Sequence, residues 1–231
     1  MENHYLVTGA SRGIGFELVK KLAEQNHLVT IVARTESKLS SLRGLFPDQI
    51  QPIPVDITTE EGRDELINHF KQQKLTLNGI VHNAGLLINK PFEDLTQNDW
   101  QDQLDVNLLA PVLLTKYLLP FMNSGCHVLH IGSMGGFQGS SKFPGLSGYS
   151  VSKGALSILT ECLAVELADR KIKCNCLCLG AVQTEMLETA FPGIQAPVKA
   201  GEMGHFISDF LTTAHHFFNG KVLPVSLADP S

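Results

Sequence analysis

Short apolar runs alternate along the chain with longer stretches in which apolar side chains recur every three or four positions. The short runs predict seven β-strands, at residues 4–8, 28–33, 50–55, 79–82, 127–131, 173–179 and 222–227. The longer stretches predict helices at residues 13–24, 36–45, 60–72, 98–121, 149–168 and 199–217. Strands that alternate with helices of this length are typical of right-handed crossovers and a parallel sheet. The predicted fold class is therefore α/β, a doubly wound, seven-stranded parallel sheet with helices on both faces.

Nothing in this pattern divides the chain into parts, since it contains no internal repeat, low-complexity tract or linker-like segment. With 231 residues, of which 43% are hydrophobic, the chain can bury a full core. This size fits one α/β domain better than two, so we expect a single domain over residues 1–231.

A glycine-rich turn connects the first predicted strand to the first predicted helix and reads Thr8-Gly9-Ala10-Ser11-Arg12-Gly13-Ile14-Gly15. Strand, glycine turn and helix in this order form the context of a dinucleotide site. The glycines let backbone N–H groups approach a pyrophosphate, which then lies at the positive end of the helix. The alternative is a tight turn that binds no ligand.

Tyr149 and Lys153 are four positions apart in a predicted helix, so the phenol and the ammonium share one face of it. A cation beside a phenol favours the phenolate and is expected to draw the tyrosine pKa down from its ordinary value of about 10. Tyr149 is therefore a candidate general acid or base. Such a pair also occurs by chance in many helices, and it gains weight from the glycine turn in the same chain.

The turn Thr-Gly-x-x-x-Gly-x-Gly and the later Tyr-x-x-x-Lys together resemble the short-chain dehydrogenase/reductase family, and the resemblance covers nearly the whole chain. It implies a Rossmann-type domain, a nicotinamide cofactor and 3-oxoacyl-reductase-like relatives. It also implies that Ser133, at the end of the fifth strand, hydrogen-bonds the substrate oxygen, while Lys153 holds the nicotinamide ribose. Ser133 lies farther from Tyr149 than is usual in the family, and three further serines lie between them: Ser140, Ser141 and Ser147.

Asn107 precedes Pro111 by four positions inside the predicted helix 98–121. Proline has no N–H, so the carbonyl of Asn107 loses its helical hydrogen-bond partner and the helix is predicted to kink here. The matching asparagine carbonyl of the family holds a water that relays protons from the lysine. Asn107, Ser133, Tyr149 and Lys153 thus form the candidate catalytic set, with a simple kink as the alternative for Asn107.

The resemblance assigns a cofactor-binding set that comes mostly from loops after the predicted strands. It comprises Gly9, Ser11, Arg12, Gly13, Ile14, Gly15, Arg34, Thr35, Asp56, Ile57, Asn83, Ala84, Gly85, Tyr149, Lys153, Gly180, Val182 and Thr184. The sequence departs from the family pattern at three places. His82 replaces the first asparagine of Asn-Asn-Ala-Gly, Leu179 replaces a proline, and the terminal Asp-Gly-Gly is absent. We expect His82 to make a buried hydrogen bond and not to act in catalysis.

The end of the second predicted strand indicates which nicotinamide cofactor is bound. An NAD site would place an Asp or Glu there to bind the ribose hydroxyls, whereas this chain has Ala33 followed by Arg34. Arg34 and Arg12 would flank the adenine ribose, where guanidinium groups suit a 2′-phosphate. NADP(H) is therefore expected, with NAD(H) less favoured. The alternative is that both arginines are simply solvated at the surface.

The sequence thus favours an NADP(H)-dependent oxidoreductase that interconverts a carbonyl and a secondary alcohol, with Tyr149 as general acid or base. Two other classes stay open: a regulatory scaffold that binds NADP without turnover, and an epimerase or dehydratase of the same family. The short substrate loop at 184–199 contains Met186, Leu187, Phe191, Pro192 and Ile194, an apolar lid suited to an acyl chain, a steroid-like ring or an aryl ketone.

Composition excludes several partners. The net charge is −5, from 23 acidic and 18 basic residues without a basic run, so nucleic acid is not expected. No run approaches the ~18 consecutive apolar residues of a membrane helix, and a cytoplasmic enzyme without a membrane partner is expected.

Three cysteines alternate along one predicted strand: Cys174, Cys176 and Cys178. Side chains in this arrangement cannot converge alone on a tetrahedral zinc. We therefore expect them to be buried packing residues and expect no metal.

The helix predicted at 149–168 carries two apolar stripes, although one would suffice to face a sheet. The first consists of Leu156, Leu159, Leu163 and Leu167, and the second of Val151, Ala155, Ile158, Cys162 and Val165. A deeply buried helix would explain both stripes. A subunit interface would explain them as well, and family members commonly pair through this helix and the one before it. We expect a homodimer or homotetramer.

Overall fold

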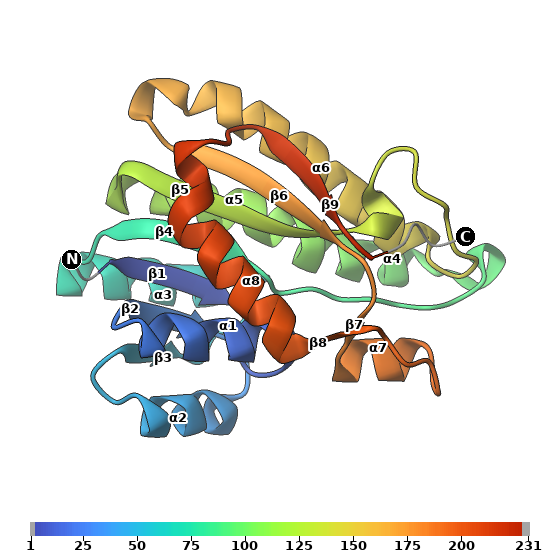
Figure 1. The fold of residues 1–231 in the computed structure, drawn as a ribbon, viewed down its shortest axis with the longest axis horizontal. Helices are drawn as coiled ribbons and strands as arrows, with labels where there is room; N and C mark the ends of the chain where they lie inside the picture. The colour runs from blue at the N-terminus through green and yellow to red at the C-terminus, as the bar shows by residue number, and fades with distance from the viewer. Residues whose placement is uncertain (1–2, 228–231) are drawn as a thin grey trace.

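Seven parallel strands form the centre of the computed structural model, in the order β3-β2-β1-β4-β5-β6-β9 (Figure 1). They are β1 (His4–Thr8), β2 (Leu28–Val32), β3 (Ile50–Ile53), β4 (Leu77–His82), β5 (Met122–Ser133), β6 (Lys173–Leu179) and β9 (Lys221–Val225). The predicted fold class is confirmed. The structure describes residues 3–227, so both ends of the predicted domain lie outside the described residues. Ala228 and Asp229, where the family has its terminal Asp-Gly-Gly, lie outside them too.

Strand β1 pairs with β2 on one side and with β4 on the other, so the order of the strands reverses at this point. The connections that leave β1 and β4 therefore diverge to opposite faces of the sheet. A crevice opens between them at the carboxyl ends of the strands, which is where doubly wound sheets bind their ligands.

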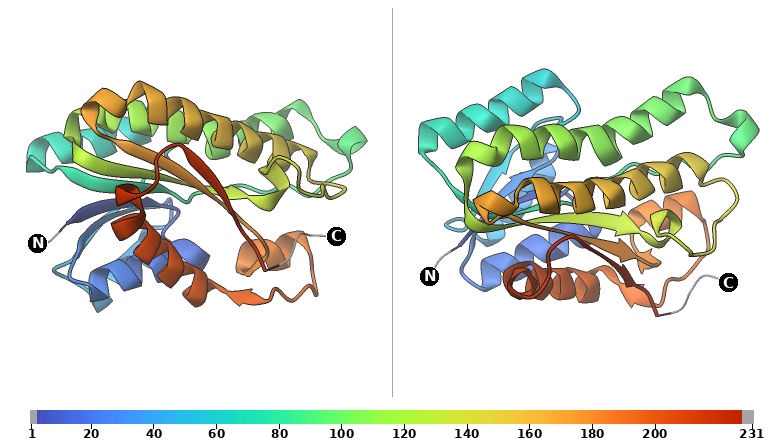
Figure 2. Two further views of the ribbon diagram at one scale, coloured as in Figure 1. Left: turned by 45° about the horizontal axis from the view of Figure 1, so that its top comes forward. Right: turned by 90° about the horizontal axis from the view of Figure 1, so that it is seen from above.

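Helices cover both faces of the sheet (Figure 2). One layer contains α1 (Gly13–Glu24), α2 (Glu36–Leu45) and α8 (Ala200–Thr213), and the other contains α3 (Glu60–Gln73), α5 (Ala110–Leu118) and α6 (Ser147–Glu166). Successive side chains of a strand point to opposite faces. Val7 accordingly packs with Leu22 of α1 and Ile207 of α8, whereas Leu6 packs with Phe70 of α3 and Leu114 of α5.

The stretch predicted as one helix at 98–121 is interrupted around Asn107. It consists of α4 (Gln97–Leu104), a π-helical turn (Asp105–Leu109), α5 and a 3-10 turn (Leu119–Phe121). Pro111 lies in the first turn of α5 and has no N–H to give to the carbonyl of Asn107. The chain widens into a π turn here, as shown by the bond from the Ala110 N–H to the Asp105 carbonyl. The helix is thus irregular where a kink was predicted, and the irregularity is a π turn.

The segment that follows β6 contains structure that the apolar pattern did not predict. Helix α7 (Glu185–Ala190) lies between two short strands, β7 (Val182–Gln183) and β8 (Val198–Lys199), which pair in parallel. Each element is too short to show a period in the sequence. Figure 1 shows α7 beyond the carboxyl ends of the central strands.

The three alternating cysteines of β6 are fully buried, which confirms their interpretation as packing residues. The hydroxyl of Ser157 on α6 lies 3.8 Å from the Cys176 sulfur and 3.7 Å from the Cys178 sulfur. Within residues 3–227, no group of three or more His, Cys, Asp or Glu side chains is arranged to hold a metal ion.

Candidate active site

The glycine-rich turn runs from the end of β1 to the start of α1 and is pressed against the loop that follows β4. Gly9 has a φ of +69°, and a Cβ atom there would lie 2.7 Å from the Cα of Ala84. A Cβ atom at Gly15 would lie 2.5 Å from the Gly9 carbonyl oxygen. Asn83 closes the contact, because its amide donates to the carbonyls of Thr8 and Gly9, each at 3.1 Å. The turn therefore tolerates no side chain at these two glycines.

Helix α1 begins directly after this turn and has no acidic residue in its first turn. Arg12 occupies the N-cap position without a side-chain capping bond. The free N–H groups at a helix start carry positive partial charge and favour an anion. The cradle of close-packed glycines and this uncompensated helix start fit the pyrophosphate of a dinucleotide.

A cavity of about 1180 Å³ lies at the carboxyl ends of the strands, next to this turn. All predicted cofactor-binding residues line it except Gly15, which packs inside the turn against Gly9. Sequence reasoning missed several other lining residues, among them Lys38, Thr58, Leu86, Leu87 and Glu185. Lys38 had a usable signal, since it is a further cation in the first turn of the helix that follows Arg34.

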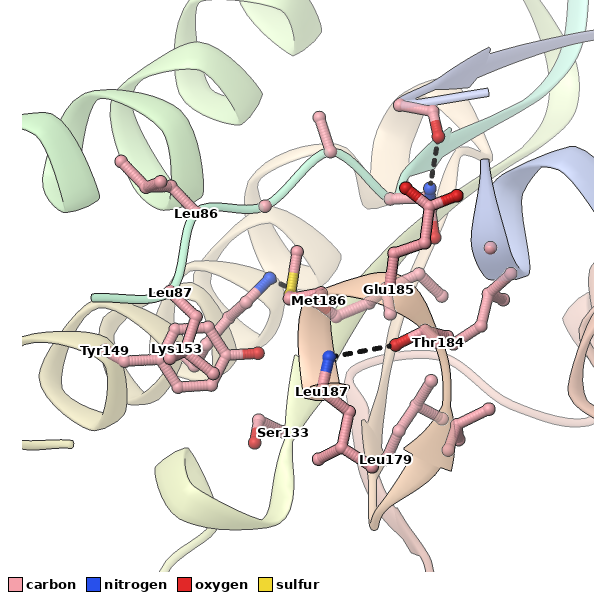
Figure 3. A pocket seen from close by; sticks show the side chains of 18 of the residues that line it. Leu86, Leu87, Ser133, Tyr149, Lys153, Leu179, Thr184, Glu185, Met186 and Leu187 are labelled. Atoms are coloured by element: carbon pink, nitrogen blue, oxygen red, sulfur yellow. Dashed lines mark hydrogen bonds between the residues drawn. The ribbon is translucent and has the colours of Figure 1, made fainter. Parts of the chain in front are cut away.

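Ser133, Tyr149 and Lys153 line this cavity together (Figure 3). Ser133 is the last residue of β5, and the other two lie one turn apart on α6. The Ser133 side chain is near enough to the phenol of Tyr149 to influence its pKa. The three alternative serines do not line the cavity: Ser140, Ser141 and Ser147. Of these four serines, Ser133 is thus the one that lines the cavity together with the phenol.

The pKa of Tyr149 differs from the value expected from the spacing of the two residues. Burial raises it to about 12, and the polar side chain of Ser133 opposes this rise. The ammonium of Lys153 lies 5.9 Å from the centre of the tyrosine ring and does not offset the burial. The expectation that Lys153 lowers the phenol pKa is therefore wrong for this structure, because desolvation is the larger effect. The phenol is neutral at pH 7 and has a proton to donate.

Lys153 is almost fully buried between α6, the sheet and the loop after β4. Its ammonium donates to the Ile131 carbonyl at 2.7 Å. A Cβ atom at Gly85 would lie 3.6 Å from this ammonium, so the charge faces a residue of the predicted cofactor-binding set. Burial lowers the pKa of Lys153 to about 8, opposed by the nearby sulfurs of Cys176 and Cys178.

Asn107 is fully buried in the π-helical turn and does not line the cavity. Its side-chain oxygen accepts from the Leu86 N–H at 2.8 Å, and its amide donates to the Leu86 carbonyl at 2.8 Å and to the Ser152 hydroxyl at 2.9 Å. These bonds hold the Leu86 backbone, which lines the cavity, at a fixed place. Sequence reasoning considered only the Asn107 carbonyl and missed this contact, since Leu86 is 21 positions away.

His82, which replaces an asparagine of the family motif, is buried and lies outside the cavity lining. Its Nε2 atom hydrogen-bonds the Thr115 hydroxyl at 2.9 Å, as expected for a buried structural histidine. The ring stacks on His130 with a centroid distance of 5.1 Å. Burial lowers the pKa of His82 to about 3, so the imidazole is neutral at pH 7.

The end of the cavity near β2 is rich in positive charge. Arg34 and Lys38 line it and are exposed to solvent. Burial would raise the pKa of Asp56, but hydrogen bonds from Thr58 and the nearby charge of Arg34 hold it below its ordinary value. Arg12 also lines this end, although its guanidinium contacts the Glu185 carboxylate at 2.8 Å.

The opposite end of the cavity, around Ser133 and Tyr149, is mostly apolar. Figure 3 shows Leu86 and Leu87 on one side of Tyr149 and Lys153, with Met186 and Leu187 of α7 across from them. Further apolar side chains complete this wall: Phe143, Leu146, Phe191 and Ile194. Of the predicted lid residues, Pro192 alone does not line the cavity.

Comparison with known proteins identifies the family. Residues 3–195 match the sequence profile described as short chain dehydrogenase. The chain belongs to this family. It is 34% identical over 191 residues to a benzil reductase ((S)-benzoin forming) of Saccharomyces cerevisiae, an alignment that covers 78% of this chain and 72% of the yeast protein.

Two solved structures extend the likeness to the fold. A 3-ketoacyl-(acyl-carrier-protein) reductase of Brucella melitensis complexed with NADH is 23% identical, with a TM-score of 0.87 over 97% of this chain and 96% of that one. A short-chain dehydrogenase of Burkholderia cenocepacia in complex with NADP is 24% identical, with a TM-score of 0.86 over 100% and 98%. The chain is thus an oxidoreductase of the short-chain dehydrogenase family.

Proposed function

We propose that the protein is an NADP(H)-dependent reductase that converts an apolar ketone to a secondary alcohol, and that the reaction is reversible. One observation carries this proposal. Ser133, Tyr149 and Lys153 lie in a cavity that continues to the glycine turn and to the cationic side chains near β2. A substrate oxygen beside Ser133 and a cofactor phosphate beside Arg34 can therefore be bound in the same cavity.

The chemistry divides between the cofactor and the chain. When bound, the nicotinamide supplies the hydride that reduces the carbonyl carbon. Tyr149, a neutral phenol at pH 7, donates its proton to the carbonyl oxygen. Ser133 hydrogen-bonds the same oxygen and orients it. Lys153 holds the ribose hydroxyls through its buried ammonium.

The irregular helix that contains Asn107 offers a route by which protons can reach this site. The Pro111 nitrogen has no hydrogen to give to the Asn107 carbonyl, which leaves that oxygen for another donor. As in the family, this carbonyl would bind a water that passes protons toward Lys153. The Asn107 side chain has a separate task, because it positions the Leu86 backbone at the cavity wall.

The substrate follows from the apolar end of the cavity. Leucine, methionine and phenylalanine side chains surround Ser133 and Tyr149, so burial of a ring or a chain stabilises the complex. The yeast relative at 34% identity is a benzil reductase, whose substrate is an aryl diketone. An aryl ketone is therefore favoured over a charged or sugar-like substrate.

The proposal is tested by following NADPH absorbance with benzil, a monoaryl ketone, a 3-oxoacyl thioester and a ketose. Turnover of the aryl ketones, with a kcat/KM at least about tenfold above that of the ketose, is expected from burial of the added apolar groups. Tight NADPH binding without turnover of any ketone would contradict the proposal and favour a regulatory NADP-binding protein.

The second apolar stripe of α6 supports a homo-oligomer. Ile158 is 60% exposed and Val165 is 78% exposed, so the helix is not buried all round within one chain. Figure 2 shows α5 and α6 side by side on one outer face, and Leu109, next to α5, is 41% exposed. Exposed apolar side chains gathered on two neighbouring helices are typical of a protein contact.

A contact through the outer face formed by α5 and α6 would also explain why one helical stretch in this region is unusually apolar. Gln97–Phe121 is long and apolar enough, with a mean hydropathy of 1.3, to meet the criteria for a membrane span. It is nevertheless interrupted by the π turn, and its polar residues Gln103, Asn107 and Thr115 are buried in the domain. Its exposed apolar surface is better explained by a second copy of the chain than by a bilayer.

A sedimentation measurement tests the assembly. At micromolar concentration the protein should have at least about twice the chain mass of 25.2 kDa. Ile158→Glu should shift it toward the monomer, because a charge in an apolar contact is costly. Leu45→Glu is the matched control, since Leu45 is 59% exposed at the end of α2, in the other helix layer. A wild-type mass near that of one chain would contradict the interface.

A further inference from the structure

One ion pair connects the glycine-rich turn to the lid helix α7. The Arg12 guanidinium contacts the Glu185 carboxylate at 2.8 Å, although the two residues are 173 positions apart in the sequence. Both side chains are about half exposed, at 53% and 57%. Thr184 caps α7 by accepting from the Leu187 N–H at 3.3 Å, which fixes the helix turn that carries Glu185 (Figure 3).

Glu185 introduces a negative charge into the cationic part of the cavity. Arg12, Arg34, Lys38 and Glu185 all line this part of the wall. The hydrogen bond from Arg12, followed by the charge of Lys38, holds the pKa of Glu185 below its ordinary value. The carboxylate is therefore ionised at pH 7 and faces the groups that would bind a cofactor phosphate.

We propose that Glu185 sets the balance between NADPH and NADH by competing with the 2′-phosphate for Arg12. The inference rests on the proposed function, since it assumes that this part of the cavity receives the 2′-phosphate. The Arg12 guanidinium can either turn to the phosphate or stay at Glu185, and in both cases Glu185 weakens the attraction between Arg12 and the phosphate. If the guanidinium turns to the phosphate it loses the ion pair, and if it stays its charge remains partly neutralised by the carboxylate.

The size of the effect follows from the exposure of the pair. Exposed ion pairs contribute little, so Glu185→Gln should tighten NADPH binding by only about 2–5-fold. NADH has no 2′-phosphate and should bind to within about 1.5-fold of wild type. The ratio of the two dissociation constants should therefore shift toward NADPH, and added salt should reduce the shift.

The experiment measures the dissociation constants of NADPH and NADH by fluorescence titration of wild type, Glu185→Gln and Glu188→Gln. Glu188 is the matched control, because it is exposed in the same helix and does not line the cavity. Its substitution removes the same charge from α7 without touching Arg12. Only Glu185→Gln is expected to change the ratio by more than the uncertainty of the titration.

A second background separates competition for Arg12 from a general charge effect. In Arg12→Met the substitution of Glu185 should no longer tighten NADPH, since the shared partner is gone. An unchanged ratio in Glu185→Gln, or an equal change in Glu188→Gln, would overturn the inference while the wild-type preference for NADPH stands. A wild type without any preference for NADPH would instead overturn the proposed function.

Discussion

Tyr149→Phe is expected to lower kcat/KM for ketone reduction by about 10²–10⁴-fold, while the dissociation constant of NADPH changes by less than about threefold. The substitution keeps the half-buried ring and removes only the hydroxyl that faces the cavity with Ser133. The carbonyl oxygen then loses the phenol as its proton donor and has only the less acidic hydroxyl of Ser133 beside it. Steady-state rates and fluorescence titration measure the two quantities separately.

Tyr117→Phe provides the matched control for this loss. It removes a hydroxyl from a tyrosine that is 43% exposed on α5 and does not line the cavity. Its kcat/KM should equal that of wild type within error. Near-normal turnover in Tyr149→Phe would show that another group donates the proton, and Tyr149 would then lose its assignment as general acid.

Arg34→Ala should weaken NADPH binding by about 10–100-fold and leave NADH almost unchanged. Hydrogen bonds to a charged group contribute roughly 1.5–3 kcal/mol each, and only NADPH has a 2′-phosphate to receive them. In the structure Arg34 lines the cavity directly after Ala33, where an NAD site would have an acidic residue. Titration of both cofactors against wild type and variant measures the difference.

Arg43→Ala serves as the control for this prediction, because Arg43 is exposed in the last turn of α2 and does not line the cavity. It removes one positive charge from the same helix layer and should leave both dissociation constants unchanged. If wild type binds NADH as tightly as NADPH, or if Arg34→Ala weakens both cofactors equally, the assignment of NADP(H) is wrong.

The expected effect of Glu185 is much smaller than that of Arg34, and the difference has a physical basis. Arg34 would contribute a direct charged contact to the phosphate, whereas Glu185 would alter the availability of Arg12. Cofactor preference in this protein is thus proposed to depend on the lid as well as on the end of β2. An attempt to change the preference between NADPH and NADH by mutation should therefore include both Arg34 and Glu185.

Local signals were sufficient to predict the sheet and the main helices, and they selected residues most of which line one cavity. Apolar runs and helical periods depend on residues that are near one another in the chain, and most predicted elements match observed ones. The glycine turn and the Tyr149–Lys153 spacing are likewise local, because each lies within one turn of backbone. Pro111 predicted the irregular helix around Asn107 for the same reason.

Distant contacts decided the rest, and no short stretch of sequence encodes them. The Asn107 side chain binds Leu86 from 21 positions away, and Arg12 meets Glu185 from 173 positions away. The high pKa of Tyr149 arises from the packing that buries it, which outweighs the charge of the lysine one turn along the helix. Local spacing therefore determined which groups occur together, whereas burial and long-range packing determined their protonation and their partners.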